Sequence, residues 1–368
     1  MEDIDLKKLF SAPGRIEIGG NHTDHQLGRV LAAAVDLVTK CTAEANGTDI
    51  VHITDDRFSD AEVDLRSLEV NEEEKGISKA LIRGVAAWFQ KHGYAIGGFD
   101  AHVSSDIPAG SGLSSSAAFE VMIGKVFKGL FDAEISPIEI AIAGQFAENV
   151  YFGKPSGMMD QVASSFGGLS MIDFQDPLLP VITPIHAGFS GYTICVVSTG
   201  GSHADLTQDY ATVRNEMKIV AAYFDKEYLR EVSPDQFYTE IGRLRPLGDR
   251  AVLRAFHFFE ENKRVLKQAD ALEKGRIPEF FDLVIESGRS SMDYLQNIYN
   301  LSHPQQQGLT LALALSEKLL SGQGAWRVHG GGFAGTILAF VPNSLREIYN
   351  KQMCEVFGEG CCLLLNIQ

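Results

Sequence analysis

Residues 108–118, PAGSGLSSSAA, place two glycines and four serines directly before an apolar run with helical spacing. Such a stretch is either a flexible linker or an ordered turn. A linker has polar sequence on both sides. This stretch instead joins a strand-like run at 98–107 to a helix predicted to continue to about residue 131. The ordered turn is favoured, and it serves either as a serine-capped helix start or as a loop whose N–H groups bind an oxyanion.

The composition limits the class of protein and its partners. The chain has 368 residues, enough for two domains or one large one, and a formal net charge of −16. That charge argues against nucleic acid and anionic membrane surfaces as partners. The first residues lack the pattern of a signal peptide, and apolar runs such as 309–315 are too short to span a bilayer. We expect a cytoplasmic monomer or weak dimer that acts on a small molecule.

The cysteines suggest free thiols. There are five, an odd number, and their spacing is irregular. No CxxC pair occurs, so neither a disulfide framework nor a structural zinc site is expected. The positions are Cys41, Cys195, Cys354, Cys361 and Cys362.

The order of predicted elements indicates an α+β protein. Strand-like runs at 192–199 and 326–341 and a long amphipathic helix at 250–275 alternate without a regular βαβ pattern. Proline- and glycine-rich sequence at 176–191 marks a break. We therefore predict two domains, residues 1–187 and 188–368.

Three further segments carry polar residues of the types that phosphoryl transfer needs. They are APGRIEIGGNHTDH at 12–25, AENVYFGKPSGMMDQ at 147–161 and VHGGGFAG at 328–335. Phosphoryl transfer requires a phosphate-binding loop, a metal ligand, a group that orients the acceptor and a nearby cation. No GxxxxGK[ST] sequence occurs, so the loop at 108–118 is not a Walker A motif.

Together these segments resemble the GHMP family of small-molecule kinases, and within it the galactokinases. The loop matches the family pattern PxGxGLSSSAA, residues 12–25 resemble the galactokinase signature APGRVNLIGEHTDY, and VHGGGFAG resembles the third motif. The resemblance implies a ribosomal-S5-like N-terminal domain, a ferredoxin-like C-terminal domain and an active site in the cleft. It implies transfer of the γ-phosphoryl group of ATP to the anomeric 1-OH of a hexose.

The resemblance also implies roles for individual residues in phosphoryl transfer. Asp160 matches the catalytic aspartate and Arg15 the arginine beside it. Ser116 and Glu148 match the ligands of Mg²⁺, which prefers a few hard protein oxygens. The phosphates of ATP would be bound by Gly110, Ser111, Gly112, Leu113, Ser114, Ser115 and Ser116.

For the sugar, the resemblance implies a second set of residues. His22 and Asp24 match residues that bind ring hydroxyls, Gly157 would offer a backbone contact, and Tyr210 matches a sugar-contacting tyrosine. Asp160 and Asn21 complete the expected substrate-binding set.

The sugar-binding segment departs from the galactokinase pattern at three positions. Asn21 stands where galactokinases carry the Glu expected to hold the 6-OH, Glu17 where they carry Asn, and His25 where they carry Tyr. Loss of a carboxylate beside C6 removes repulsion of a substrate carboxylate there. Asn21, and a protonated His25, would also donate hydrogen bonds to that carboxylate.

Galactose is the first choice of substrate, slightly ahead of galacturonate, because the likeness to galactokinases is broad and because we expect Glu17 to reach the hydroxyl that the missing carboxylate would hold. Galacturonate is the alternative. A non-catalytic sensor of galactose and ATP is a further alternative, disfavoured by the intact loop and by the presence of Asp160 and Arg15.

Overall fold

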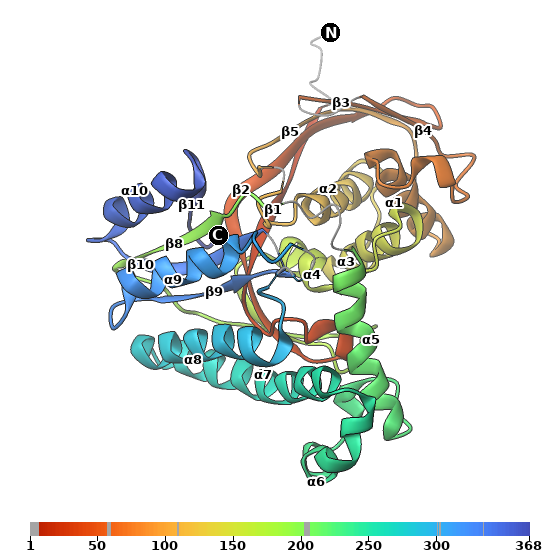
Figure 1. Cartoon of the computed structure of the whole chain (residues 1–368). Helices are drawn as coiled ribbons and strands as arrows, with labels where there is room; N and C mark the ends of the chain where they lie inside the picture. Colours follow the sequence, from red (N-terminus) through yellow and green to blue (C-terminus); the bar gives the residue numbers. More distant parts are fainter. Residues whose placement is uncertain are drawn as a thin grey trace. The chain divides into compact units, whose positions relative to one another are not determined.

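The computed structural model describes residues 7–56, 60–108, 110–201, 207–299, 301, 303–333 and 335–368 (Figure 1). The chain divides into two compact units. The first comprises Met1–Arg15, Ala34–Ala109 and Leu113–Gly167, and the second comprises Ile16–Ala33, Gly110–Gly112 and Gly168–Gln368. Both units are discontinuous in sequence, whereas the prediction placed one boundary between residues 187 and 188. Residues 16–33 and 168–187, predicted in the N-terminal domain, belong to the second unit.

The first unit contains a sheet with strand order β4-β3-β5-β2. Its strands are β4 (Ala61–Asp64), β3 (Ile50–Asp55), β5 (Phe99–Ser105) and the later part of β2 (Arg29–Ala45). Strands β3 and β5 are parallel, and the other two pairs are antiparallel. Four helices gather on one face of this sheet (Figure 1), namely α1 (Ser78–Lys91), α2 (Ser115–Leu130), α3 (Pro137–Phe146) and α4 (Met159–Phe166).

Local sequence explains these elements. In β3, Val51 and Ile53 are buried while the residues between and after them are exposed, the alternation of a half-buried strand. Helix α3 begins with a capping box, because the Ser136 side chain accepts from the Glu139 backbone and the Glu139 side chain accepts from Ser136. It continues into a π-helical turn, Ala147–Phe152, and a 3₁₀ turn, Glu72–Glu74, precedes α1.

The second unit contains a four-stranded antiparallel sheet of order β11-β8-β10-β9. Its strands are β8 (Tyr192–Ser198), β9 (Ala325–His329), β10 (Thr336–Pro342) and β11 (Cys362–Leu365). Side chains alternate along β10. Ile337, Ala339 and Val341 pack with α9 (Gly308–Leu320) and α10 (Arg346–Phe357), whereas Phe340 packs against aromatic rings of α8 (Ile277–Ser290).

A helical layer completes the second unit. The long helix α7 (Asp249–Glu273) lies beside α8, and a core forms where α7 meets α5 (Thr207–Tyr223) and α6 (Pro234–Leu244) (Figure 1). A π-helical turn, Ser291–Leu295, follows α8, and 3₁₀ turns lie at Asp24–Gln26, Leu229–Glu231 and Arg245–Leu247. The start of β2 pairs with β6 (Leu169–Asp173), which pairs with β7 (Val181–Pro184).

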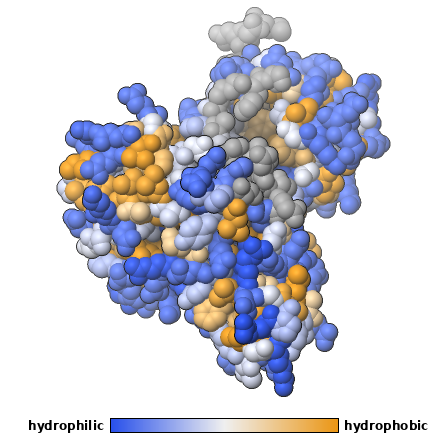
Figure 2. Space-filling view, in the orientation of Figure 1, coloured by the Kyte–Doolittle hydropathy of each residue, from blue (hydrophilic) through white to orange (hydrophobic). Residues whose placement is uncertain are grey.

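The surface and the helices are the features relevant to contact with a membrane. Figure 2 shows hydrophobic residues in small groups among hydrophilic ones on the face in view. Within the described part of the chain, every helix is too short or too polar to cross a bilayer.

Candidate functional site

Asp160 is the centre of a hydrogen-bonded group in the first unit. It lies in the first turn of α4. Its Oδ1 accepts from Arg15 Nε, on strand β1 (Lys8–Gly19), at 2.7 Å, and its Oδ2 accepts from Ser114 Oγ at 2.5 Å. The Asp160 side chain keeps 21% of its exposure, against 7% for Arg15. Asp160 is thus fixed in orientation through both oxygens and still reaches solvent.

The surroundings of Asp160 keep its carboxyl ionised. Burial opposes the charged form. The charge and hydrogen bond of Arg15, the hydrogen bond from Ser114 and the charge of Lys154 outweigh burial and hold the pKa of Asp160 below its ordinary value. The group is therefore an anion at neutral pH.

Glu148 forms a second polar group in the same unit. It lies on the π-helical turn after α3, with only 1% of its side chain exposed. Its Oε1 accepts from Ser116 Oγ at 3.1 Å and from Lys154 Nζ at 2.8 Å, and its Oε2 accepts from Ser156 Oγ at 2.6 Å and Gln161 Nε2 at 3.0 Å. The two expected Mg²⁺ ligands, Ser116 and Glu148, are therefore together. Lys154, Ser156 and Gln161 were not predicted.

Glu120 is a further carboxyl that the sequence analysis missed. It lies on α2 with no exposed surface, and its Oε2 accepts from the same Gln161 amide that binds Glu148. Burial, with the nearby Glu148 charge, raises the pKa of Glu120 well above its ordinary value. The signal in the sequence is a single charged residue within the apolar run 117–124.

The glycine-serine loop has the backbone of an ordered turn. Gly110, Gly112 and Ser114 all have positive φ, at 71°, 73° and 57°, and helix α2 begins at Ser115. A Cβ on Gly112 would lie 2.5 Å from Thr336 Oγ1, so glycine is required there on two grounds. The Ser111 hydroxyl is buried without a partner among the described residues, so its hydrogen-bonding capacity is available to a ligand.

Leu113 and Ser115 complete the predicted loop. Leu113 is fully buried, and its carbonyl accepts from the Arg15 backbone N–H at 3.1 Å. Ser115 is the first residue of α2 and is half-buried. The N–H groups of the first turn of α2 have no partner one turn earlier in the helix, which is the arrangement that attracts anions.

Three predicted sugar-binding residues converge on the triple-glycine loop of the second unit. The Gly330 carbonyl accepts from Asn21 Nδ2 at 2.8 Å, the Gly331 carbonyl lies 2.9 Å from His22 Nε2, and the Gly332 carbonyl accepts from the Tyr210 hydroxyl at 3.1 Å. Each glycine carbonyl is thus held by a different side chain. The loop and residues 21–22 of the signature therefore form one structural group within this unit.

Asn21 is fully engaged by protein partners. Its second N–H donates to Glu17 Oε1 at 2.9 Å, and its Oδ1 accepts from Ser291 Oγ at 3.1 Å and Asn297 Nδ2 at 2.8 Å. With the Gly330 bond these four contacts exhaust the amide. Glu17 in turn accepts from Arg327 at 2.7 Å, with side-chain exposures of 5% and 0%. The carboxylate at position 17 is therefore buried in an ion pair.

His22 and His25 form a pair whose tautomers follow from their partners. The Gly331 carbonyl can only accept, so His22 Nε2 carries the proton. Burial lowers the pKa of His22 to about 4, so its Nδ1 carries no proton and accepts a hydrogen bond from His25 Nε2 at 3.3 Å. Burial and the His22 and Arg214 charges lower the pKa of His25 well below its usual value. His25 Nδ1 is left as a buried acceptor with no donor among the described residues.

Asp24 and Gly157 are the remaining predicted sugar-binding residues. Asp24 lies on the 3₁₀ turn and its Oδ1 accepts from the His25 backbone N–H at 2.8 Å. Gly157 follows Ser156, a Glu148 partner, in the first unit, whereas Asp24 belongs to the second. Both residues are half-buried.

Comparison with known proteins identifies the family. The model of the GHMP kinases N-terminal domain matches residues 80–168, and the galactokinase galactose-binding signature matches residues 3–44. A galactokinase of Glaesserella parasuis is 33% identical over 351 residues, which cover 94% of this chain and 88% of that protein. The chain belongs to the galactokinase family of GHMP kinases. A Mannheimia succiniciproducens galactokinase is also 33% identical, over 93% of this chain and 90% of its own length.

Solved structures confirm the two-domain fold of this family. A crystal structure of Lactococcus lactis galactokinase complexed with galactose has a TM-score of 0.86 and 26% identity, and the match covers 99% of this chain and 94% of that chain. Methanococcus jannaschii mevalonate kinase shares the fold with a TM-score of 0.70 at 15% identity. The predicted α+β GHMP kinase fold is therefore correct, and ATP is the phosphoryl donor used by the family.

Proposed function

We propose that this member of the galactokinase family transfers the γ-phosphoryl group of ATP to the anomeric 1-OH of galactose. The observation that carries the proposal is the carboxylate of Asp160, which Arg15 and Ser114 hold ionised and fixed in orientation. The sugar oxygen forms a bond to the γ-phosphorus, its proton passes to Asp160, and the bond to the β–γ bridging oxygen breaks to release ADP. Arg15 offsets negative charge on the transferred group.

For the nucleotide, we propose Gly110–Ser116 as the phosphate-binding segment. The unpartnered Ser111 hydroxyl and the left-handed backbone at three of these positions support this assignment. Ser116 and Glu148 would hold Mg²⁺. Their oxygens lie 3.1 Å apart, near the spacing of about 3 Å for neighbouring ligands in an octahedron with bonds of about 2.1 Å. When bound, the ion would supply positive charge that neutralises the phosphates of ATP.

For the sugar, we propose Asp24, Gly157 and Tyr210 as contacts to the ring hydroxyls. His22, also expected there, has both ring nitrogens engaged by Gly331 and His25, so we propose that it positions the triple-glycine loop.

The case for galacturonate had two grounds: the absence of a carboxylate at position 21 and donors at positions 21 and 25. The second ground loses support. Both N–H groups of Asn21 are used by Glu17 and Gly330, and the lowered pKa of His25 keeps that ring neutral. Galactose therefore remains the preferred substrate. The expectation that Glu17 reaches the 6-OH loses support as well, because Arg327 and Asn21 occupy its carboxylate.

The decisive test measures ADP release with a panel of sugars. Galactose should give sugar-dependent ADP release and a sugar 1-phosphate, while galacturonate, N-acetylgalactosamine and glucose should give little. ADP release with galacturonate alone would assign the alternative substrate. Tight binding of galactose and ATP without any ADP release would assign the sensor role.

A further inference from the structure

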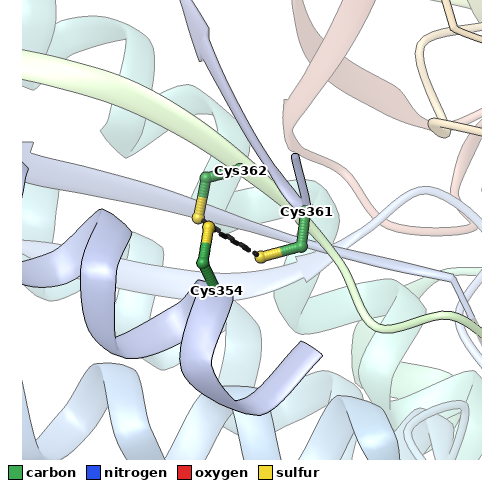
Figure 3. Close-up of side chains that lie close together, drawn as sticks. All are labelled: Cys354, Cys361 and Cys362. Carbon is green, nitrogen blue, oxygen red and sulfur yellow. Dashed lines mark hydrogen bonds between the residues drawn. The ribbon is translucent and has the colours of Figure 1, made fainter. Parts of the chain in front are cut away.

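Three of the five cysteines, Cys354, Cys361 and Cys362, meet in the second unit although their spacing forms no CxxC pair. Cys361 Sγ lies 3.7 Å from Cys354 Sγ and 3.8 Å from Cys362 Sγ, and all three sulfurs lie within 4.8 Å of one another. Figure 3 shows the three side chains turned toward a common point. We call this set the thiol cluster.

Two adjoining elements build the thiol cluster. Cys354 lies in the last turn of α10, and the chain then makes an exposed turn at 358–360 and enters β11 at Cys362. The backbone around Cys361 is fixed, because its carbonyl accepts from the Ser198 N–H at 2.8 Å. Cys361 is buried, whereas Cys354 and Cys362 are half-buried. The cluster is therefore preformed on one side and open to an entering ion on the other.

We propose that Cys354, Cys361 and Cys362 together bind one thiophilic d¹⁰ metal ion, with Zn²⁺ as the reference ion. Thiolates are the ligands that select such ions. A Zn–S bond of about 2.3 Å with tetrahedral angles requires sulfurs about 3.8 Å apart. Two of the three Sγ–Sγ distances, 3.7 and 3.8 Å, match that edge and the third lies within 4.8 Å, so binding needs little rearrangement. The thiols release their protons to solvent as the Zn–S bonds form.

The fourth position has a nearby oxygen donor. Asn350 Oδ1 lies 3.6 Å from Cys354 Sγ, one helical turn earlier on α10. A tetrahedral ion with Zn–S of about 2.3 Å and Zn–O of about 2.1 Å places sulfur and oxygen about 3.6 Å apart. Either this oxygen or water completes the coordination. The metal is held by three sulfurs, and Asn350 is not essential.

A disulfide between Cys354 and Cys361 is the alternative use of the thiol cluster. A disulfide would join two of the three sulfurs and leave the third, whereas one thiophilic ion contacts all three. The approach of all three sulfurs to one another therefore favours metal binding.

Occupancy would join the last helix to an edge strand. β11 lies at the edge of the four-stranded sheet and pairs with β8 alone among the described strands. A metal that binds only the folded chain raises stability by RT ln(1 + [M]/Kd), about 2.7 kcal/mol at a hundredfold excess over Kd. The proposal therefore predicts metal-dependent stability that is independent of kinase turnover.

The test is a Zn²⁺ titration of the full-length, fully reduced protein against a chromophoric chelator, followed by thermal melting. We expect one Zn²⁺ per chain and a rise in melting temperature. Cd²⁺ should give a thiolate charge-transfer band that shrinks in each of Cys354→Ser, Cys361→Ser and Cys362→Ser. The matched control is Cys41→Ala, which removes a buried thiol outside the cluster and should keep the full response.

Three results would overturn the proposal. One is the absence of chelator competition in the reduced wild-type protein. Another is an unchanged Zn²⁺ stoichiometry in the triple serine variant, which would place the metal elsewhere. The third is a loss of two hydrogens by mass, between Cys354 and Cys361, in mild peroxide with saturating Zn²⁺ present, which would assign a disulfide instead. Because the readouts are binding and melting, failure here leaves the proposed kinase activity untouched.

Discussion

Exchanging the side chains at positions 17 and 21 tests how the signature segment is held. Galactokinases carry Asn and Glu at these positions, and this chain carries Glu17 and Asn21. Asn21 donates to Glu17 at 2.9 Å, and Glu17 accepts from the fully buried Arg327 at 2.7 Å. The two exchanged residues are thus in direct contact. Each single variant breaks the contact, while the double variant reverses its direction.

The structure sets the sizes of these effects. Asn21→Glu removes two donated hydrogen bonds and brings a second carboxylate against Glu17. At about 1–3 kcal/mol for each unsatisfied buried group, with repulsion added, we expect a loss of about 3–5 kcal/mol. Glu17→Asn deprives buried Arg327 of its partner, again costing about 3–5 kcal/mol, although Glu261 at 4.0 Å softens the loss. The double variant should be more stable than the sum of the singles by about 2–3 kcal/mol.

The assay is urea denaturation of the wild type, the two single variants and the double variant. The double-mutant cycle uses the free energy of the unfolding transition that shifts in Glu17→Asn. Asn21→Glu combined with Glu74→Gln is the control, because Glu74 pairs with Arg83 in the first unit. That pair should be additive. If the exchange at 17 and 21 is equally additive, the described contact between the two side chains does not exist in solution.

Three further predictions concern catalysis, the loop and pH. Asp160→Asn should lower kcat by about 10²–10⁴-fold while nucleotide binding persists, whereas Asp173→Asn, which also breaks an arginine pair, should keep kcat. Retained turnover in the first would reject its role. Gly112→Ala should lower the free energy of unfolding by about 1–3 kcal/mol and raise KM for ATP. Gly110→Ala is its control, because Gly110 has a similar φ but a Cβ there meets open space. It should change the melting temperature and KM less. Because the folded pKa of His22 is depressed to about 4, the unfolded chain binds the extra proton as pH falls from about 6.5, so stability is lost across that window. In denaturation curves, His22→Asn should lose about 1–3 kcal/mol less stability than the wild type as the pH falls. Identical dependence of stability on pH in the two proteins would contradict the prediction.

Much of the fold follows from local patterns. The helix expected after the glycine-serine loop, to about residue 131, is α2 (Ser115–Leu130), and the expected helix at 250–275 is α7 (Asp249–Glu273). The two runs around the triple glycine are β9 and β10. These elements have regular apolar spacing and clear ends, so periodicity is enough. The family motifs then predicted the residues of one site, and the structure brings each of them into contact with another. They are Arg15, Ser114, Asp160, Ser116 and Glu148.

Other features depend on contacts across the sequence. Glu120 is separated from Glu148 by a long stretch, and only the packing of α2 with α4 brings both to Gln161. The sequence suggested that the Asn21 side chain is available to bind substrate, because its partners Ser291 and Asn297 lie in the other half of the chain. The thiol cluster escaped notice because spacing rules for zinc sites assume CxxC pairs, whereas a helix end and a strand start supply these ligands.

The tight pairing of Arg15 with Asp160 has a kinetic consequence. A carboxylate stabilised this strongly is a poor proton acceptor, so in the proposed reaction a sugar hydroxyl would give up its hydrogen only late, once its oxygen is already bonding to phosphorus. The rate should then be nearly flat through the mildly acidic range and show little dependence on the acidity of the acceptor alcohol. Such an enzyme would gain most of its rate from aligning the sugar hydroxyl with the γ-phosphorus. Displacing the acceptor by a fraction of an ångström would then lower the rate more than making its hydroxyl less acidic.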